Sequence, residues 1–125
     1  MRQGIAIVML LGIMLLIYVD YRQRQTIAEL IEYEAMGLTA EGQGARAIKE
    51  GWTQKDGKLP VNPSGGLKAK GHPIGATGVS MHALAAMQLT GAAGDLQVRN
   101  ARLGGIFNMG GTSVANYVSV LERIK

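Results

Sequence analysis

The stretch from Asn62 to Gly78 restricts the fold more than any other part of the chain. It reads NPSGGLKAKGHPIGATG, with two prolines and with glycines at short intervals. Proline removes a backbone donor and fixes its own φ, and glycine weakens helix and strand interiors. Long loops without regular structure are usually either functional or disordered. The sequence therefore predicts a long, shaped loop over these residues.

Regular elements are expected after this loop. A helix is predicted from about Ala76 to Thr90, where Ala, Met and Leu predominate, and it should be buried on most sides. The end of the chain then alternates in character over 102–108 and 114–122, on either side of a glycine turn at 109–111. Such alternation predicts a β-hairpin or two neighbouring strands.

Before the loop, the sequence predicts a helix, a helical turn and a hairpin. An amphipathic helix should begin with the capping pattern at Thr26 and end at Gly37, with an apolar stripe that includes Ile27 and Ile31. A short helical turn is expected around 45–50. The pair Asp56-Gly57 is a hairpin-turn signal between two short arms, 52–55 and 58–61, and Pro60 indicates that the second arm is an edge strand or leaves the sheet there.

The N-terminal segment differs from the rest. Residues Gly4 to Val19 contain no charged side chain. As a helix this run would extend about 24 Å, slightly less than the hydrocarbon core of a membrane at about 30 Å. Two hypotheses stay open: a short membrane helix, or a helix or pair of strands buried in a larger core. We expect a segment boundary at residue 25, with a separate domain over 26–125.

Composition excludes several classes of function. The 125 residues include 47% hydrophobic residues, enough for about one modest domain. The net charge of +4 is spread along the chain and aromatic residues are few, so nucleic-acid binding by base stacking is not indicated. No cysteine occurs. The chain thus has no disulfide, no thiolate metal site and no sulfur nucleophile of its own.

His72 is the leading candidate for chemistry. Imidazole can accept and return a proton near neutral pH. Pro73 restricts His72 to extended backbone, and Gly71 and Gly75 permit close approach of other groups. The alternative is a histidine that only forms a hydrogen bond within a turn, and spacing alone favours this alternative slightly. His82 is expected to be a packing or surface residue.

The other glycines are weaker signals. The motif GHPIGATG matches neither the Walker loop nor the dinucleotide fingerprint. Asn62, Ser64, Gly65 and Gly66 could line a binding loop as donors, or could simply form its turns. The N–H groups around Gly110 could stabilise an oxyanion, although ordinary turns have the same sequence.

The stretches NPSGGLKAKGHPIGATG and GGIFNMGGTSVANYVSVLE, with TIAELIEYEAMGL and DGKLPV upstream, together resemble the C-terminal part of thiolases. The likeness is to the sterol-carrier-protein-type branch, which includes acetyl-CoA acetyltransferases, and it covers Thr26 to Ile124. It implies an α/β fold, the C-terminal layered αβα half of the five-layered αβαβα thiolase fold. It also implies acyl transfer between coenzyme A esters through an acyl-cysteine, with coenzyme A as substrate, no further cofactor and no metal.

The resemblance assigns roles to residues. His72 would activate the nucleophilic thiol and help to hold a thioester oxygen, and Gly110 would donate to the second oxyanion hole. Asn108 takes the place of the family's proton-shuttling cysteine in a Cys-x-Gly-Gly turn. The loop residues Asn62, Ser64, Gly65, Gly66 and Gly71 would contact the acyl-CoA.

Three departures predict an incomplete enzyme. The half that carries the nucleophilic cysteine is missing, Asn108 cannot titrate, and Arg22 to Gln25 replaces another oxyanion-hole element. We therefore expect the isolated chain to be inactive and to work with a second polypeptide or thiolase N-terminal half, as an oligomer. The change near residue 25 predicts a truncated, rearranged or frame-shifted gene.

Two further hypotheses are a retro-aldolase subunit acting on acyl-CoA esters and a non-catalytic, membrane-tethered remnant. The expected location is the cytoplasm, or a membrane reached through Gly4 to Val19.

Overall fold

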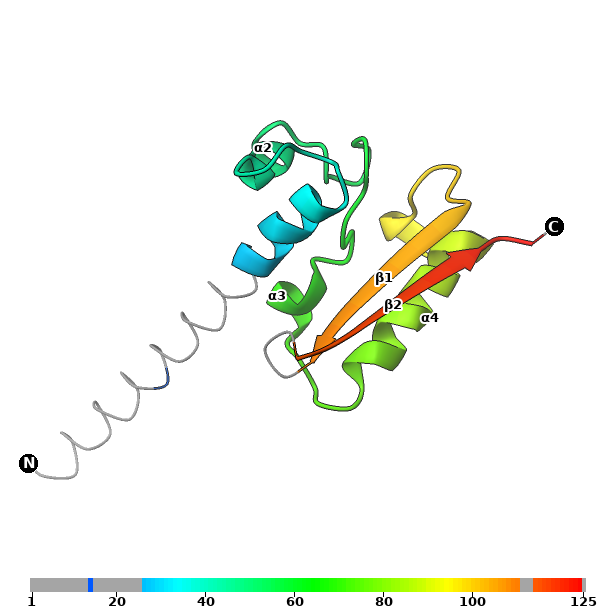
Figure 1. Cartoon of the computed structure of the whole chain (residues 1–125). Coiled ribbons are helices and arrows are strands. Elements are labelled where there is room, and N and C mark those ends of the chain that lie inside the picture. Colours follow the sequence, from blue (N-terminus) through cyan, green and yellow to red (C-terminus); the bar gives the residue numbers. More distant parts are fainter. Residues whose placement is uncertain (1–13, 15–25, 111–113, 125) are drawn as a thin grey trace, which may run out of the picture. The chain divides into compact units, whose positions relative to one another are not determined.

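A computed structural model describes residue 14 and residues 26–110 and 114–124 (Figure 1). The chain divides into two compact units, Met1–Gly51 and Trp52–Lys125. The predicted apolar helix over Gly4 to Val19 falls, apart from Met14, outside the described residues. Within the described part of the chain, no helix is both long and apolar enough to cross a membrane.

The first unit contains a helix over residues 26–35 and the short helix α2, Gly44–Lys49. The longer helix ends as predicted, because Gly37 adopts a left-handed φ of 72° that suits glycine. The hydroxyl of Tyr33, which is buried, donates to Glu29 Oε1 at 2.6 Å. The φ of Gly37 confirms the predicted helix end, and α2 confirms the helical turn predicted around 45–50.

Polar contacts hold the segment between these helices. The backbone N–H of Gly44 donates to Glu34 Oε1 at 2.7 Å.

The longer helix also carries a carboxyl with a shifted pKa. Partial burial raises the pKa of the Glu32 carboxyl above its ordinary value, and the charge of Glu29 raises it further. The predicted apolar stripe is only partly correct, because Ile27 and Ile31 are exposed in the described part of the chain and Tyr33 is the buried side chain.

The second unit begins with a turn rather than with the predicted pair of hairpin arms. The N–H of Leu59 donates to the carbonyl of Trp52 at 2.9 Å, and that of Val61 to Thr53 at 3.0 Å, but residues 52–61 form no strand. Pro60 has no N–H and cannot extend a ladder of backbone hydrogen bonds. Lys58 Nζ lies 3.6 Å from the centroid of the Trp52 ring, which closes the turn by a cation–π contact.

A helix packed on a two-stranded sheet forms the rest of this unit. Strands β1, Leu103–Gly110, and β2, Ala115–Glu122, pair antiparallel, and α4, Thr77–Thr90, runs along one face of the hairpin (Figure 1). Ile106 of β1 and Leu89 of α4 are buried at this contact. The predicted helix and hairpin are confirmed. Strand β1 ends at Gly110, two residues later than predicted.

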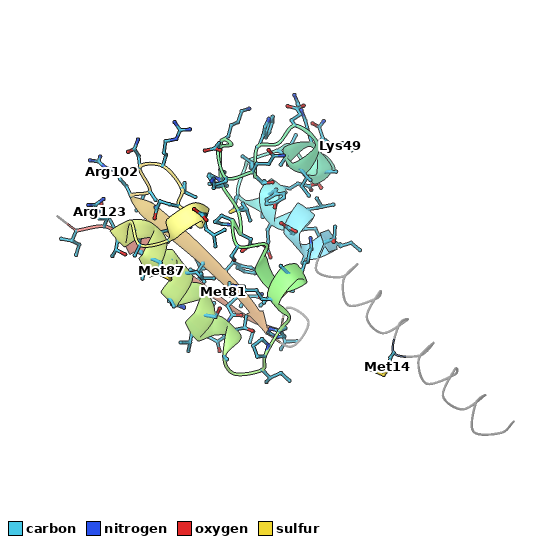
Figure 2. All side chains as sticks on the ribbon, turned by 180° about the vertical axis from the view of Figure 1, so that it is seen from behind. Met14, Lys49, Met81, Met87, Arg102 and Arg123 are labelled. Atoms are coloured by element: carbon cyan, nitrogen blue, oxygen red, sulfur yellow. The ribbon has the colours of Figure 1, made fainter. Side chains whose placement is uncertain are left out.

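The helix α4 is less buried than its composition suggests. Only Thr77 and Leu89 are buried among its residues, whereas Val79 is 72% exposed. The reason is that the described residues cover α4 on one side only, the side that faces the hairpin. Met81 and Met87 both lie on this helix (Figure 2). The prediction that the helix is buried on most sides is therefore wrong for this structure.

The sheet also has one covered and one open face. Alternation along a strand puts Phe107, Val118 and Val120 on the face opposite α4, and all three are exposed. At the end of the hairpin, the N–H of Arg123 donates to the carbonyl of Arg102 at 3.0 Å, and both arginines are labelled in Figure 2. The α/β class is confirmed, while the layered half appears only as one helix on two strands.

Candidate functional site

His72 lies between two helices of the second unit. It follows α3, Gly66–Lys70, a short helix inside the segment that was predicted to be entirely loop, and it precedes α4. Gly71 and Gly75 on either side have φ of 80° and 82°. A residue with a side chain would be strained in this left-handed region. Glycine is therefore required on both sides of the His72-Pro73 pair, and the imidazole is held at the surface, where it is exposed.

A threonine at the start of α4 fixes the imidazole. His72 Nδ1 lies 2.7 Å from Thr77 Oγ1, and the same hydroxyl contacts the carbonyl oxygen of Pro73 at 3.1 Å. Thr77 is only 5% exposed and is the buried polar residue of this unit's described part. The ring is thus anchored at one nitrogen by a buried group while the residue itself stays at the surface.

Packing of the hairpin on α4 brings Asn108 to the same turn of helix. A Cβ added at Gly78 would lie 3.1 Å from Asn108 Nδ2, so the amide is in close contact with Gly78. Gly78 directly follows Thr77, the partner of His72. The structure therefore places the predicted general base and the residue at the cysteine position beside one helical turn, although the two lie 36 positions apart in the sequence.

Gly110 lies two residues beyond Asn108, at the end of β1. It pairs with Ala115 across the hairpin and is half-buried. A backbone donor at a strand end can stabilise charge on an oxyanion when it is directed at the reacting carbonyl. The role of Gly110 stays a prediction, and Gly111 lies outside the described residues.

The proposed acyl-CoA loop is a tight turn at the start of α3. Asn62 has a φ of 46°, and its carbonyl accepts from the N–H of Gly65 at 2.8 Å. A Cβ on Gly66 would lie within 3.2 Å of the Asn62 side chain. These contacts show how Asn62, Gly65 and Gly66 form the turn, next to the half-buried Ser64. The substrate contacts expected of this group and of Gly71 stay predictions.

Two residue pairs were not foreseen in the sequence. One is the contact of Thr77 with His72, for which the only signal was a hydroxyl residue in the first turn after GHP. The other is the contact of His82 Nε2 with Ser119 Oγ at 3.1 Å, which joins α4 to β2. Within α4, the Nδ1 atom of the same ring lies 2.7 Å from the carbonyl oxygen of Gly78. His82 is exposed, as a surface residue was predicted to be. The described residues include no group of three or more acidic, histidine or cysteine side chains that could hold a metal.

Comparison with known proteins gives a family match over most of the chain. The family described as thiolase C-terminal domain-like matches residues 18–123. Acetyl-CoA acetyltransferase of Methanothermobacter thermautotrophicus is 45% identical over 98 residues, which are 78% of this chain and 26% of that protein.

Two further relatives match this chain over smaller shares of their own length. Human sterol carrier protein 2 is 49% identical over 82 residues, 66% of this chain and 15% of that protein. The benzoylsuccinyl-CoA thiolase subunit BbsB of Thauera aromatica is 39% identical over 71 residues, 57% of this chain and 18% of that subunit. The chain thus spans about a quarter or less of the length of these curated relatives.

Proposed function

Because the chain belongs to the thiolase family, through a thiolase C-terminal domain, we propose that it supplies one half of an acyl-transfer site whose nucleophilic thiol is on another polypeptide. The proposal depends on two facts about the sequence. The GHP histidine of the family is present as His72, and no cysteine occurs anywhere in the chain.

The observation that carries this proposal is the geometry of His72. Its ring is exposed, anchored at Nδ1 by the buried Thr77, and placed on a loop that two left-handed glycines shape. A general base must lie within hydrogen-bond reach of the proton that it removes. An imidazole held in this way at the surface could meet a thiol that belongs to a second chain.

The chemistry would follow the family resemblance. In thiolysis, His72 would take the proton of the partner's thiol, and the sulfur would form a bond to the keto carbon of a 3-ketoacyl-CoA. The bond between the keto carbon and the α-carbon then breaks, and the departing α-carbon takes up a proton to give acetyl-CoA. Finally, the sulfur of free coenzyme A takes the acyl group, and the proton of its thiol passes to the released cysteine sulfur, which restores the partner's thiol. The proton for the α-carbon must come from a group other than Asn108, because an amide does not titrate.

The test is complementation with a half-enzyme that carries cysteine. The N-terminal part of the Methanothermobacter acetyl-CoA acetyltransferase, cut before the region matched here, would be co-expressed with this chain. We expect thiolysis of acetoacetyl-CoA by the complex, none by this chain alone, and none when the partner's nucleophilic cysteine is replaced by serine. Thiolysis by the purified chain alone would contradict the division of the site, and an inactive complex that is stably assembled would contradict the proposal as a whole.

A second candidate function follows from Asn108. Because this residue replaces the proton-shuttling cysteine, the site suits a reaction that does not need that shuttle, such as retro-aldol cleavage of a β-hydroxyacyl-CoA by a two-chain lyase. Co-purification of this chain with its natural partner would supply the material for the assay. Aldol cleavage without thiolysis would favour the lyase, and thiolysis without aldol cleavage would exclude it.

A further inference from the structure

We propose that Thr77 is a positioning residue that holds the neutral ring of His72 in one tautomer, with the proton on Nδ1 and the lone pair on Nε2. The use of Nε2 as a base rests on the proposed function. The tautomer itself is argued from the contacts of the Thr77 hydroxyl with His72 and Pro73.

The argument begins with the number of protons available. A threonine hydroxyl has one proton to donate and two lone pairs with which to accept. Thr77 Oγ1 has two close neighbours, the carbonyl oxygen of Pro73 at 3.1 Å and Nδ1 of His72 at 2.7 Å. The carbonyl oxygen can only accept, whereas Nδ1 donates in one tautomer and accepts in the other.

Only one arrangement makes both contacts hydrogen bonds. If the Thr77 proton points to Pro73, then Oγ1 is left to accept, and Nδ1 must carry a proton. If the proton points to Nδ1 instead, two oxygens face each other at 3.1 Å with no proton between them. The first arrangement gains one hydrogen bond and avoids this repulsion, so it should be favoured.

Burial makes the choice consequential. Thr77 is 5% exposed, so its hydroxyl has little access to water as a substitute partner. The Pro73 carbonyl is fixed in the turn that leads into α4, where it also accepts from the N–H of Ala76 at 3.1 Å and of Thr77 at 3.2 Å. The carbonyl that accepts the Thr77 proton therefore cannot move away without disturbing the start of α4.

His82 supplies a reference within the same helix. Its Nδ1 contacts a backbone carbonyl, Gly78 O, at 2.7 Å, and a carbonyl can only accept. His82 must therefore carry its proton on Nδ1 whenever this bond is formed. The ring nitrogens of His82 give the spectrum expected for the tautomer that we assign to His72.

The experiment is nitrogen-15 spectroscopy of the imidazole rings in the full chain, at alkaline pH where imidazole is neutral. Three variants are compared with the parent chain. Thr77→Val keeps the shape but removes the hydroxyl, and Thr77→Ser keeps the hydroxyl. Thr90→Val is the matched control, because Thr90 donates to the carbonyl of Ala86 at 2.8 Å in the same way, at the far end of α4.

In the parent chain we expect His72 to show a protonated Nδ1, as His82 does. Thr77→Val should lower the ratio of the two His72 tautomers by roughly 2- to 12-fold, the factor that corresponds to the net worth of one hydrogen bond. Thr77→Ser should restore the ratio, and Thr90→Val should leave it unchanged. The His82 signals should stay the same in all four proteins, which also reports that the helix is intact.

The inference is overturned if His72 carries its proton on Nε2 in the parent chain, or if Thr77→Val leaves its tautomer ratio unchanged. Neither result depends on catalysis. A complex that is inactive while the Thr77→Val shift is present would contradict the proposed function and leave the tautomer assignment standing. In an active complex, Thr77→Val should lower kcat/KM and Thr77→Ser should restore it. That result would link the tautomer of His72 to the proposed catalysis.

Discussion

The two histidines of this chain lie on either side of the start of α4, His72 in the loop before it and His82 within it, and their Nδ1 atoms meet different kinds of oxygen. In both, Nδ1 is 2.7 Å from an oxygen. His82 meets a carbonyl within α4 and reaches Ser119 on β2 with its other nitrogen, so it links the helix to the sheet. His72 meets a hydroxyl within its own loop-to-helix junction.

The comparison shows that the chemical type of the oxygen next to Nδ1, carbonyl or hydroxyl, decides whether that contact alone fixes the tautomer of the ring. The distance does not decide it. A carbonyl oxygen can only accept, so it fixes the tautomer of the histidine that it contacts without the help of a further group. A hydroxyl does so only when a second acceptor takes its proton, as Pro73 does for Thr77. The His72 region therefore depends on a small relay of local contacts, and the His82 region depends on tertiary packing.

Replacement of each histidine by glutamine should show the largest difference. In a complex with a cysteine-bearing half, His72→Gln should lower kcat/KM for acetoacetyl-CoA thiolysis by roughly 10²- to 10⁴-fold, the usual contribution of a positioned acid or base. His82→Gln should remain close to the parent rate. Equal losses in both variants, measured with equal amounts of assembled complex, would remove the distinction between the two regions.

The backbone beside His72 should be the next most sensitive feature. Gly75→Ala places a side chain at a φ of 82° and should reduce the free energy of unfolding by about 1–2 kcal/mol. Gly105→Ala is the control, because a Cβ there would meet nothing within 4 Å and its φ is not in the left-handed region. Denaturant unfolding of both variants checks this. A loss in Gly105→Ala as large as that in Gly75→Ala would show that any added methyl is harmful.

The contact between Gly78 and Asn108 should give a smaller effect. A methyl group at Gly78 would crowd Asn108 Nδ2 at 3.1 Å. Overpacking of this kind costs about 1–3 kcal/mol, and alanine returns up to about 1 kcal/mol as the better helix former. We expect Gly78→Ala to destabilise by about 1 kcal/mol.

A double-mutant cycle tests the origin of that loss. In the Asn108→Ala background, Gly78→Ala should become neutral or stabilising, because the crowded amide is gone and only the helix preference remains. Additive effects of the two substitutions would mean that Asn108 does not rest against the first turn of α4 in solution.

Several features of the fold could be predicted because their signals are local. Gly91 follows the apolar helix and adopts a φ of 77°, as a glycine at a helix end usually does. The alternation on either side of the glycine turn at 109–111 is enough to predict the hairpin. The family likeness points to His72 through a continuous motif.

Other features depend on packing that no short pattern encodes. The turn signal at Asp56-Gly57 was correct and Pro60 already limited the second arm, but that residues 52–61 form no strand at all was not predicted. The approach of Asn108 to Gly78 depends on the register of β1 against α4, which a local motif does not specify. The role proposed for Thr77 depends on which way one hydroxyl proton points, and that follows only from the positions of both groups next to the hydroxyl, Nδ1 of His72 and the carbonyl of Pro73.

Removal of the Ser119 hydroxyl should have the smallest effect, and it tests the His82 side of the comparison. Ser119→Ala deletes one neutral hydrogen bond at an exposed histidine, so the free energy of unfolding should fall by about 0.5 kcal/mol, the low end for such bonds. The His82 tautomer should not change, because the Gly78 carbonyl still holds the proton on Nδ1. A switch of tautomer in Ser119→Ala would mean that the serine, rather than the carbonyl, orders this ring. In that case His82, like His72, would depend on a hydroxyl, and the contrast between the two histidines would be lost.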